Sequence, residues 1–168
     1  DKYNIDHIPF YISTPQDQYQ DLISVLGDAK DFHWVSDESI IAANPRVTAG
    51  IENTRPGGLS QQAIKSEFWR LGLAENYVCF DSDCIFIKDF KKSDFLSSDG
   101  YPYTVIYQNK EFYQLSINRG KSKIESNLRQ EGDRVKALFS RVGPNYYCPC
   151  PPFIWSAKVW ESLDVQYL

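Results

Sequence analysis

Two aspartates, Asp81 and Asp83, stand directly after the apolar run Tyr77-Val78-Cys79-Phe80. That run predicts a strand covered on both faces, where unpaired carboxylates are costly and need a cation or hydrogen-bond donors. In an extended chain, residues i and i+2 share a face, so Asp81 and Asp83 can point the same way. Mg²⁺ or Mn²⁺ accepts a few carboxylates and completes its shell with water and phosphate oxygens. The pattern favours a divalent metal site; the alternative is one turn-capping aspartate and one solvated aspartate.

The segment before this strand supplies donor groups. Residues 60–73 have helical spacing of apolar side chains, and Gln61, Gln62 and Lys65 lie on the same predicted helix. Gln62 and Lys65 are an i, i+3 pair and can share a face. Two amides and one ammonium can hydrogen-bond a sugar and contact a phosphate, respectively. For each residue alone, a solvent-facing helix surface is the competing interpretation.

The order of elements around these residues indicates an α/β fold, whose ligands gather beyond the carboxyl ends of the strands. Apolar runs and helical periods alternate along the first half of the chain. The expected elements are a strand at 9–13, a helix at 15–26 ended by Gly27, a strand at 32–35, an irregular loop at 44–58, the helix at 60–73 and the strand at 77–80. We expect one domain over residues 1–168.

The second half is less regular. We expect a strand at 101–107, an amphipathic helix ended by Gly143-Pro144, and a short last helix near 159–163. Residues 146–153 are too rich in proline for regular structure. Arg119 to Arg141 holds seven basic side chains, for which a solvated helical face is the default and an anionic acceptor or membrane surface the alternative. Cys79, Cys84, Cys148 and Cys150 match no common zinc spacing, so we expect reduced thiols.

Composition narrows the function classes. The chain has 168 residues, 42% of them apolar and 24% charged, and its net charge is −4. This excludes an intrinsically disordered polymer and argues against bulk binding to nucleic acid. There is neither an 18-residue apolar run nor a signal-peptide pattern, so we expect no transmembrane segment and a cytoplasmic location.

The sequence resembles a group of small, mostly uncharacterised bacterial glycosyltransferases of the GT-A fold. In them a Gly-x-x-x-Gln-Gln-x-x-Lys helix precedes a strand ending in Asp-x-Asp, as in residues 57–65 and 77–83 here. Two further stretches are similar: residues 32–38, a strand leading to an acidic turn, and residues 151–156, a Pro-Pro-x-x-Trp segment. The resemblance covers residues 9–90 and 146–163.

The resemblance implies a mixed sheet flanked by helices and transfer of a sugar from a UDP- or GDP-linked donor to a glycan or small-molecule acceptor. It implies Mn²⁺ or Mg²⁺ as cofactor, held by Asp81 and Asp83. Asp37, Gln61, Gln62, Lys65 and Asp81 are the implied donor-binding residues. Pro152 and Trp155 are the implied residues on the acceptor side.

One departure concerns the ends. Such enzymes begin with a strand and a helix before the segment similar to residues 9–13, and only eight largely polar residues precede Pro9 here. We therefore expect the chain to be truncated at both ends, to lack the first strand and helix, and to be inactive as a fragment. No residue stands out as an acceptor base: Asp133, Glu161 and Asp164 are not ranked by the sequence, and the stereochemical course stays open.

Two other functions fit parts of the pattern. A haloacid-dehalogenase-like phosphatase or phosphotransferase also ends a strand in Asp-x-Asp and uses the first aspartate as nucleophile. Against it, the motif lies in mid-chain, and Cys84 stands where Gly or Thr is usual. A non-enzymatic carbohydrate-binding module is the second alternative, because 4 Trp and 11 Tyr offer flat contact surfaces.

Overall fold

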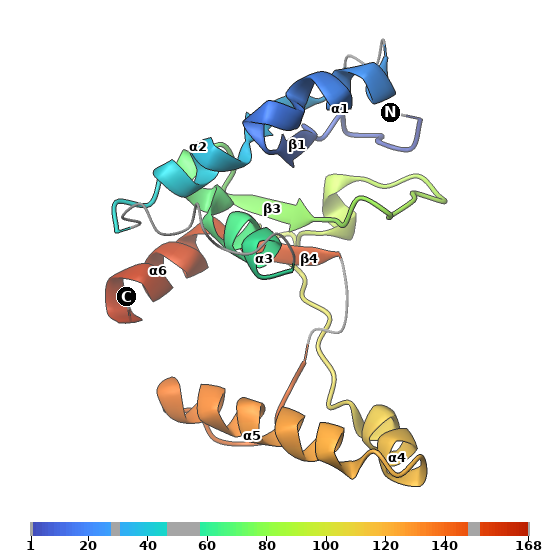
Figure 1. Ribbon diagram of the computed structural model, residues 1–168, viewed down its shortest axis with the longest axis vertical. Coiled ribbons are helices and arrows are strands. Elements are labelled where there is room, and N and C mark those ends of the chain that lie inside the picture. The colour runs from blue at the N-terminus through green and yellow to red at the C-terminus, as the bar shows by residue number, and fades with distance from the viewer. Residues whose placement is uncertain (1, 28–30, 47–57, 148–151, 168) are drawn as a thin grey trace. The chain divides into compact units, whose positions relative to one another are not determined.

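The structure is a computed structural model that describes residues 2–27, 31–46, 58–147 and 152–167. It is a mixed α/β protein with small sheets and several helices (Figure 1). The chain divides into two compact units, which we describe separately. Unit 1 is Asp1–Tyr103 with Ile154–Leu168, and unit 2 is Thr104–Phe153. The expected α/β class is confirmed at this coarse level, whereas a single domain stays a prediction.

Unit 1 begins with a parallel β-α-β arrangement. Strand β1 (Tyr11–Thr14) pairs in parallel with β2 (His33–Ser36), and Tyr11 lies opposite His33. The connection contains the short 3-10 helix η1 (Gln16–Gln18) and helix α1 (Tyr19–Leu26). Helix α1 ends at Gly27, whose φ of 58° is a conformation that glycine adopts at little cost. This arrangement confirms the strand, helix and strand predicted over residues 9–35.

Helix α2 (Asp37–Ala42) follows β2 without a loop. The backbone N–H of Ser39 donates to Ser36 Oγ over 3.1 Å, and acidic side chains in the first turn complement the helix dipole. The sequence predicted only an acidic turn after this strand. Helix α2 was therefore not predicted. Its residue Ile40 is fully buried.

The second sheet of unit 1 carries the chemistry-bearing motif. Helix α3 (Gly58–Glu67) continues into the 3-10 helix η3 (Phe68–Leu71), and β3 (Asn76–Cys79) follows. Strand β3 pairs with β4 (Phe153–Ser156), which leads directly into helix α6 (Ala157–Tyr167). The prediction of no regular structure up to residue 153 is wrong at Phe153. Pairing with β3 supplies backbone partners that the local sequence does not indicate.

Aromatic rings connect these elements. The ring of Phe68 in η3 lies 5.6 Å from Tyr11 and 5.1 Å from Tyr77. Tyr77 in turn meets Trp155 edge-on at 5.9 Å, and Trp155 meets Trp160 at 5.1 Å. Edge-to-face rings at these separations attract each other beyond their buried area. One chain of contacts therefore joins β1, η3, β3, β4 and α6.

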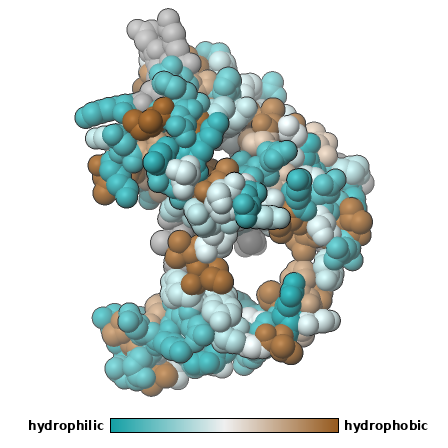
Figure 2. All heavy atoms as spheres, turned by 180° about the vertical axis from the view of Figure 1, so that it is seen from behind, coloured by the Kyte–Doolittle hydropathy of each residue, from teal (hydrophilic) through white to brown (hydrophobic). Residues whose placement is uncertain are grey.

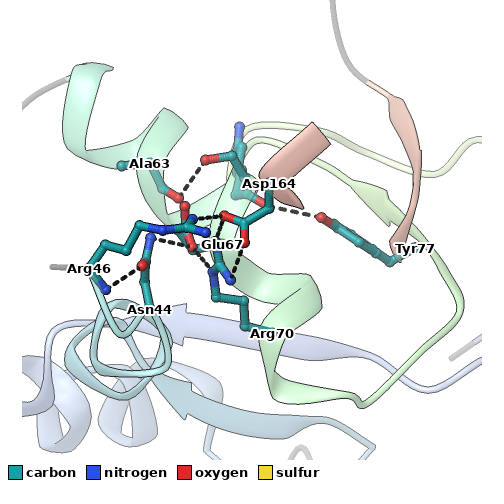
Figure 3. A network of polar contacts seen from close by, with 9 residues as sticks. Asn44, Arg46, Ala63, Glu67, Arg70, Tyr77 and Asp164 are labelled. Atoms are coloured by element: carbon teal, nitrogen blue, oxygen red, sulfur yellow. Dashed lines mark hydrogen bonds and ion pairs between the residues drawn. The ribbon is translucent and has the colours of Figure 1, made fainter. Parts of the chain in front are cut away.

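A polar network adds a second connection between α3, η3 and α6 (Figure 3). The carboxylate of Asp164 accepts from the guanidinium groups of Arg70 and Arg46, and Arg70 also pairs with Glu67. Asn44 Nδ2 donates to Glu67 Oε2 over 3.1 Å. The Asp164 side chain is only 12% exposed and that of Arg70 9%, so each charge depends on the other for compensation.

Unit 2 is a pair of helices with a short bridge. Helix α4 (Lys110–Asn118) precedes α5 (Ser122–Leu138), and Tyr107 and Tyr147 exchange backbone hydrogen bonds of 3.0 and 2.9 Å. The predicted helix is present, because Val135 and Leu138 lie on α5, but it ends at Leu138 and not at Gly143-Pro144 as expected. The strand predicted at 101–107 is wrong: this segment makes isolated bridges at Pro102 and Tyr107 only. Its alternating side chains lack a neighbouring strand to complete a ladder.

Unit 1 also contains a short 3-10 helix, η4 (Lys92–Asp94). Many large apolar side chains are exposed, and Figure 2 shows them as brown areas among teal ones. Among the described residues, the buried apolar side chains are Ile40, Phe90 and Tyr113. No helix in the described ranges is both long and apolar enough to cross a membrane.

Ile40→Ala should destabilise unit 1 by about 3 kcal/mol, because the truncated side chain leaves a cavity at a fully buried position. Ile40→Val should cost about 1 kcal/mol. Urea unfolding followed by far-ultraviolet circular dichroism measures both. Val25→Ala is the control, since Val25 is 83% exposed and its truncation should change the unfolding free energy by less than about 0.5 kcal/mol. Equal effects at both positions would contradict the assigned core.

The Asp164 network should make stability depend on acid pH. Hydrogen bonds from Arg70 and then Arg46 hold the pKa of Asp164 below its ordinary value of 3.8. A carboxyl with a depressed pKa stabilises the fold fully above its unfolded pKa and loses this contribution as pH falls through the folded pKa. Asp164→Asn should therefore lower Tm at pH 7, and the gap from the wild type should shrink below pH 3.8. A gap that is constant down to pH 2.5 would argue against the ion pairs.

Candidate functional site

The two aspartates of the motif lie in a tight turn after β3. The backbone N–H of Cys84 donates to the carbonyl oxygen of Asp81 over 3.0 Å, which places Ser82 and Asp83 at the centre of the turn. The expectation of an extended chain here is wrong. Asp and Ser are common turn residues because their side chains hydrogen-bond nearby backbone, and the β-ladder has already ended at Cys79. Asp83 is exposed, and Asp81 is half-buried.

Helix α3 brings two predicted residues to Asp81. Lys65 Nζ forms an ion pair and hydrogen bond with Asp81 Oδ1, and Gln61 Nε2 lies 3.4 Å from the same oxygen. The Lys65 side chain is 10% exposed and that of Asp81 36%. Spacing by four residues puts Gln61 and Lys65 on one face of the helix. The structure thus joins three of the predicted donor-binding residues, from two different elements, at one point.

The site rests on a fixed piece of backbone. Tyr77 Oη donates to the carbonyl oxygen of Lys65 over 3.3 Å, so β3 holds the end of α3 at the residue that carries the ammonium. Cys79, two residues before Asp81, is a neighbour that our sequence reasoning did not assign to the site. The signal was present, because residues i and i+2 of a strand share a face. Burial raises the pKa of the Cys79 thiol to about 11, Lys65 lowers it and Asp81 raises it.

Gln62 and Asp37 lie apart from this contact. Gln62 is exposed on α3. Asp37, the first residue of α2, accepts a hydrogen bond from Ser13 Oγ at the carboxyl ends of β1 and β2. Burial raises the pKa of Asp37, the Ser13 hydrogen bond opposes the rise and Glu38 adds to it. Within the part of the chain that the structure describes, no hydrogen bond or ion pair joins Asp37 to Asp81.

The two residues expected on the acceptor side differ in their surroundings. Pro152 is exposed, and it precedes β4. Trp155 is half-buried on β4, where its ring contacts Tyr77 and Trp160. Its visible role is therefore packing of unit 1. A contact of either residue with an acceptor stays a prediction.

The three unranked carboxylates are now distinguishable. Asp164 is engaged by two arginines, and Asp133 in unit 2 by Lys136 and Asn145; these hydrogen bonds lower the pKa of each carboxyl. A carboxylate with a depressed pKa is a weak proton acceptor. Glu161, exposed on α6, lines an open hollow of about 490 Å³ that also includes Trp69 and Lys158. Asp81 lines neither this hollow nor the smaller one, of about 190 Å³, beside His33.

The donor set at the turn fits a metal ion only in part. The described residues contain no group of three or more His, Cys, Asp or Glu side chains able to hold a metal by themselves. Mg²⁺ is commonly bound through one or two carboxylates plus substrate phosphates, with several waters retained. Asp81 and Asp83 meet that smaller requirement. These two carboxylates therefore suit a cation that binds together with a phosphate ligand. They suit a cation coordinated by protein groups alone less well.

The two cysteines near the turn should react at different rates. At pH 8 a thiol with a pKa of about 11 is almost entirely protonated, and Cys79 is also half-buried, whereas Cys84 is exposed. Iodoacetamide should label Cys84 at least about tenfold faster than Cys79, as followed by peptide mass spectrometry. In denaturant the difference should vanish. Equal labelling of the native chain would contradict the half-buried position of Cys79. Cys148 and Cys150 lie outside the described residues.

Comparison of the chain with protein-family models, with curated proteins and with solved structures finds no match in any of the three. The contacts between helix α3 and the turn after β3 are therefore the observations that bear on function.

Proposed function

We propose that this chain is a GT-A-like glycosyltransferase domain. In this proposal it transfers a sugar from a UDP- or GDP-linked donor to a glycan or small-molecule acceptor in the cytoplasm, with Mn²⁺ or Mg²⁺. The observation that carries the proposal is the meeting of Gln61, Lys65 and Asp81 at the carboxyl end of β3. An acid, an ammonium and an amide at that edge of a sheet suit the diphosphate and the sugar of such a donor.

The residues have distinct tasks in this reaction. Glycosyl transfer releases a nucleoside diphosphate with added negative charge, and a divalent cation, when bound, stabilises that leaving group as a Lewis acid. Lys65 supplies one further positive charge. The amides of Gln61 and Gln62 are able to hydrogen-bond sugar hydroxyl groups. Asp81 and Asp83 supply the carboxylate oxygens that a hard cation prefers.

Two features of the fold support the proposal. The β1–α1–β2 arrangement is parallel, and such arrangements place ligands beyond the carboxyl ends of the strands. One acidic residue, Asp37, stands at such an end after β2, and a second, Asp81, follows β3 of the other sheet. The described residues form two two-stranded sheets instead of one mixed sheet, and so the GT-A topology is itself part of the proposal.

Nucleotide binding tests the proposal. Isothermal titration of UDP and GDP into the full natural polypeptide should show binding with Mn²⁺ that weakens at least about tenfold in EDTA. Asp83→Ala should remove the dependence on Mn²⁺, because it deletes an exposed carboxylate at the centre of the turn. The same titrations on Asp81→Asn should give the same loss.

The matched control is Asp21→Ala. This variant deletes an exposed aspartate on α1, the helix that connects β1 to β2 in the other sheet. It should bind both nucleotides as the wild type does. Unchanged metal-dependent binding in Asp83→Ala would sink the assignment of the site. Hydrolysis of an aryl phosphate with Mg²⁺, lost in Asp81→Asn, would instead favour the phosphatase alternative. Glycan binding without nucleotide binding would favour the binding module.

A further inference from the structure

Lys65 holds the position that a cation needs at Asp81. Its ammonium pairs with Oδ1 of Asp81, and its side chain is nine-tenths buried. A buried ammonium is costly unless it is paired and hydrogen-bonded, and Asp81 provides that compensation. In the structure without ligand, the first carboxylate of the motif is therefore already neutralised from within the chain.

We propose that Lys65 is an internal counter-ion that makes the site select a metal–diphosphate complex over the free metal. Without ligand, Lys65 pairs with Asp81; when a metal–diphosphate complex enters, the ammonium leaves Asp81 Oδ1 and pairs with a phosphate oxygen. This inference rests on the proposed function and specifies the form in which the donor is bound. Lys65 acts here as a specificity-determining residue.

The charges at the turn support this selection. Asp81 and Asp83 together carry two negative charges, and the ion pair with Lys65 leaves one. A free divalent cation has to approach Asp81 against the positive charge of Lys65, and it offers the displaced ammonium no new partner. A diphosphate arrives with its own negative oxygens. The displaced ammonium then exchanges one anionic partner, the carboxylate of Asp81, for another, a phosphate oxygen.

The geometry allows the side chain to move while its backbone stays. Tyr77 Oη donates a hydrogen bond to the Lys65 carbonyl oxygen over 3.3 Å, and Lys65 lies two residues before the end of α3. A lysine ammonium sits on a flexible four-carbon stem, so rotation of that stem is sufficient to redirect the charge. Asp81 is 36% exposed, and the oxygen that loses the ammonium is thus reachable from solvent.

The inference has a thermodynamic signature. If metal and diphosphate each favour release of Lys65 from Asp81, each raises the affinity for the other by the same factor. Removing the ammonium of Lys65 should weaken that coupling. Binding of the metal alone should become tighter, and binding of the metal together with the diphosphate should become weaker. A purely structural ion pair predicts something else: its loss frees Asp81 for Mn²⁺ alone but does not weaken binding of Mn²⁺ together with a diphosphate.

The decisive variant is Lys65→Met, which keeps a long apolar side chain and removes the charge. Titration of Mn²⁺ alone, followed by electron paramagnetic resonance of the free ion, should show binding about fivefold tighter than in the wild type. Titration of Mn²⁺ with saturating UDP should show binding about fivefold weaker. Lys65→Arg keeps the positive charge and should bind Mn²⁺ alone as weakly as the wild type.

Control variants separate this effect from general charge and folding. Lys88→Met removes one exposed ammonium near the turn and should leave both titrations within about twofold of the wild type. Thermal melts and far-ultraviolet circular dichroism establish that each variant is folded. If Lys65→Met does not fold, Lys65→Gln replaces it in both titrations. Mn²⁺ alone should again bind more tightly than in the wild type, and Mn²⁺ with saturating UDP more weakly.

The outcomes distinguish the inference from the proposed function. Tighter binding of Mn²⁺ alone and weaker binding of Mn²⁺ with inorganic diphosphate by Lys65→Met, in a chain whose wild type binds no Mn²⁺–UDP or Mn²⁺–GDP, would support the counter-ion and overturn the glycosyltransferase. Unchanged or weaker binding of Mn²⁺ alone by Lys65→Met, in a chain that binds Mn²⁺–UDP, would overturn the counter-ion and leave the proposed function standing. Opposite shifts in the two titrations support both.

Discussion

The position of α3 depends on the ion network around Asp164. Arg70, in the 3-10 continuation of α3, is paired with Asp164 of α6 and with Glu67 of α3 itself. These charges are nearly buried, and removal of Arg70 would take the ion-pair partner from Glu67 and one of two from Asp164. Because Glu67 lies two residues after Lys65, the network that fixes the end of α3 also fixes the ammonium that meets Asp81.

Aromatic packing complements this electrostatic connection. The ring of Tyr77 contacts Phe68 and Trp155, while its hydroxyl donates to the backbone of Lys65. One side chain of β3 thus contributes to the core with its ring and to the site with its polar end. The buried apolar core among the described residues is small, so directional contacts of this kind have a large part in positioning the turn.

At the site, the same residues serve stability and the proposed chemistry. An ammonium that compensates a carboxylate in the ligand-free protein is also a ready partner for a diphosphate, since both are anions. The partial donor set of Asp81 and Asp83 is consistent with a cation that enters with its phosphate ligand. A site of this kind needs fewer protein ligands than an enclosed metal centre, because the substrate supplies the remaining oxygens.

The sequence by itself determined the local elements and the residue types of the site. Apolar runs and helical spacing predicted β1, α1, β2, α3 and β3, and placed Gln61, Gln62 and Lys65 on one helix. The pair expected to share a helix face was Gln62 and Lys65, whereas the structure brings Gln61 and Lys65 to Asp81. Only the tertiary structure decided that Asp81 turns toward Lys65, that Asp37 is held by Ser13, and that Phe153 begins a strand. Those outcomes depend on partners distant in sequence, such as Asp164 for Arg70 and β3 for β4. Local propensity carries no information about a partner that only folding brings into contact.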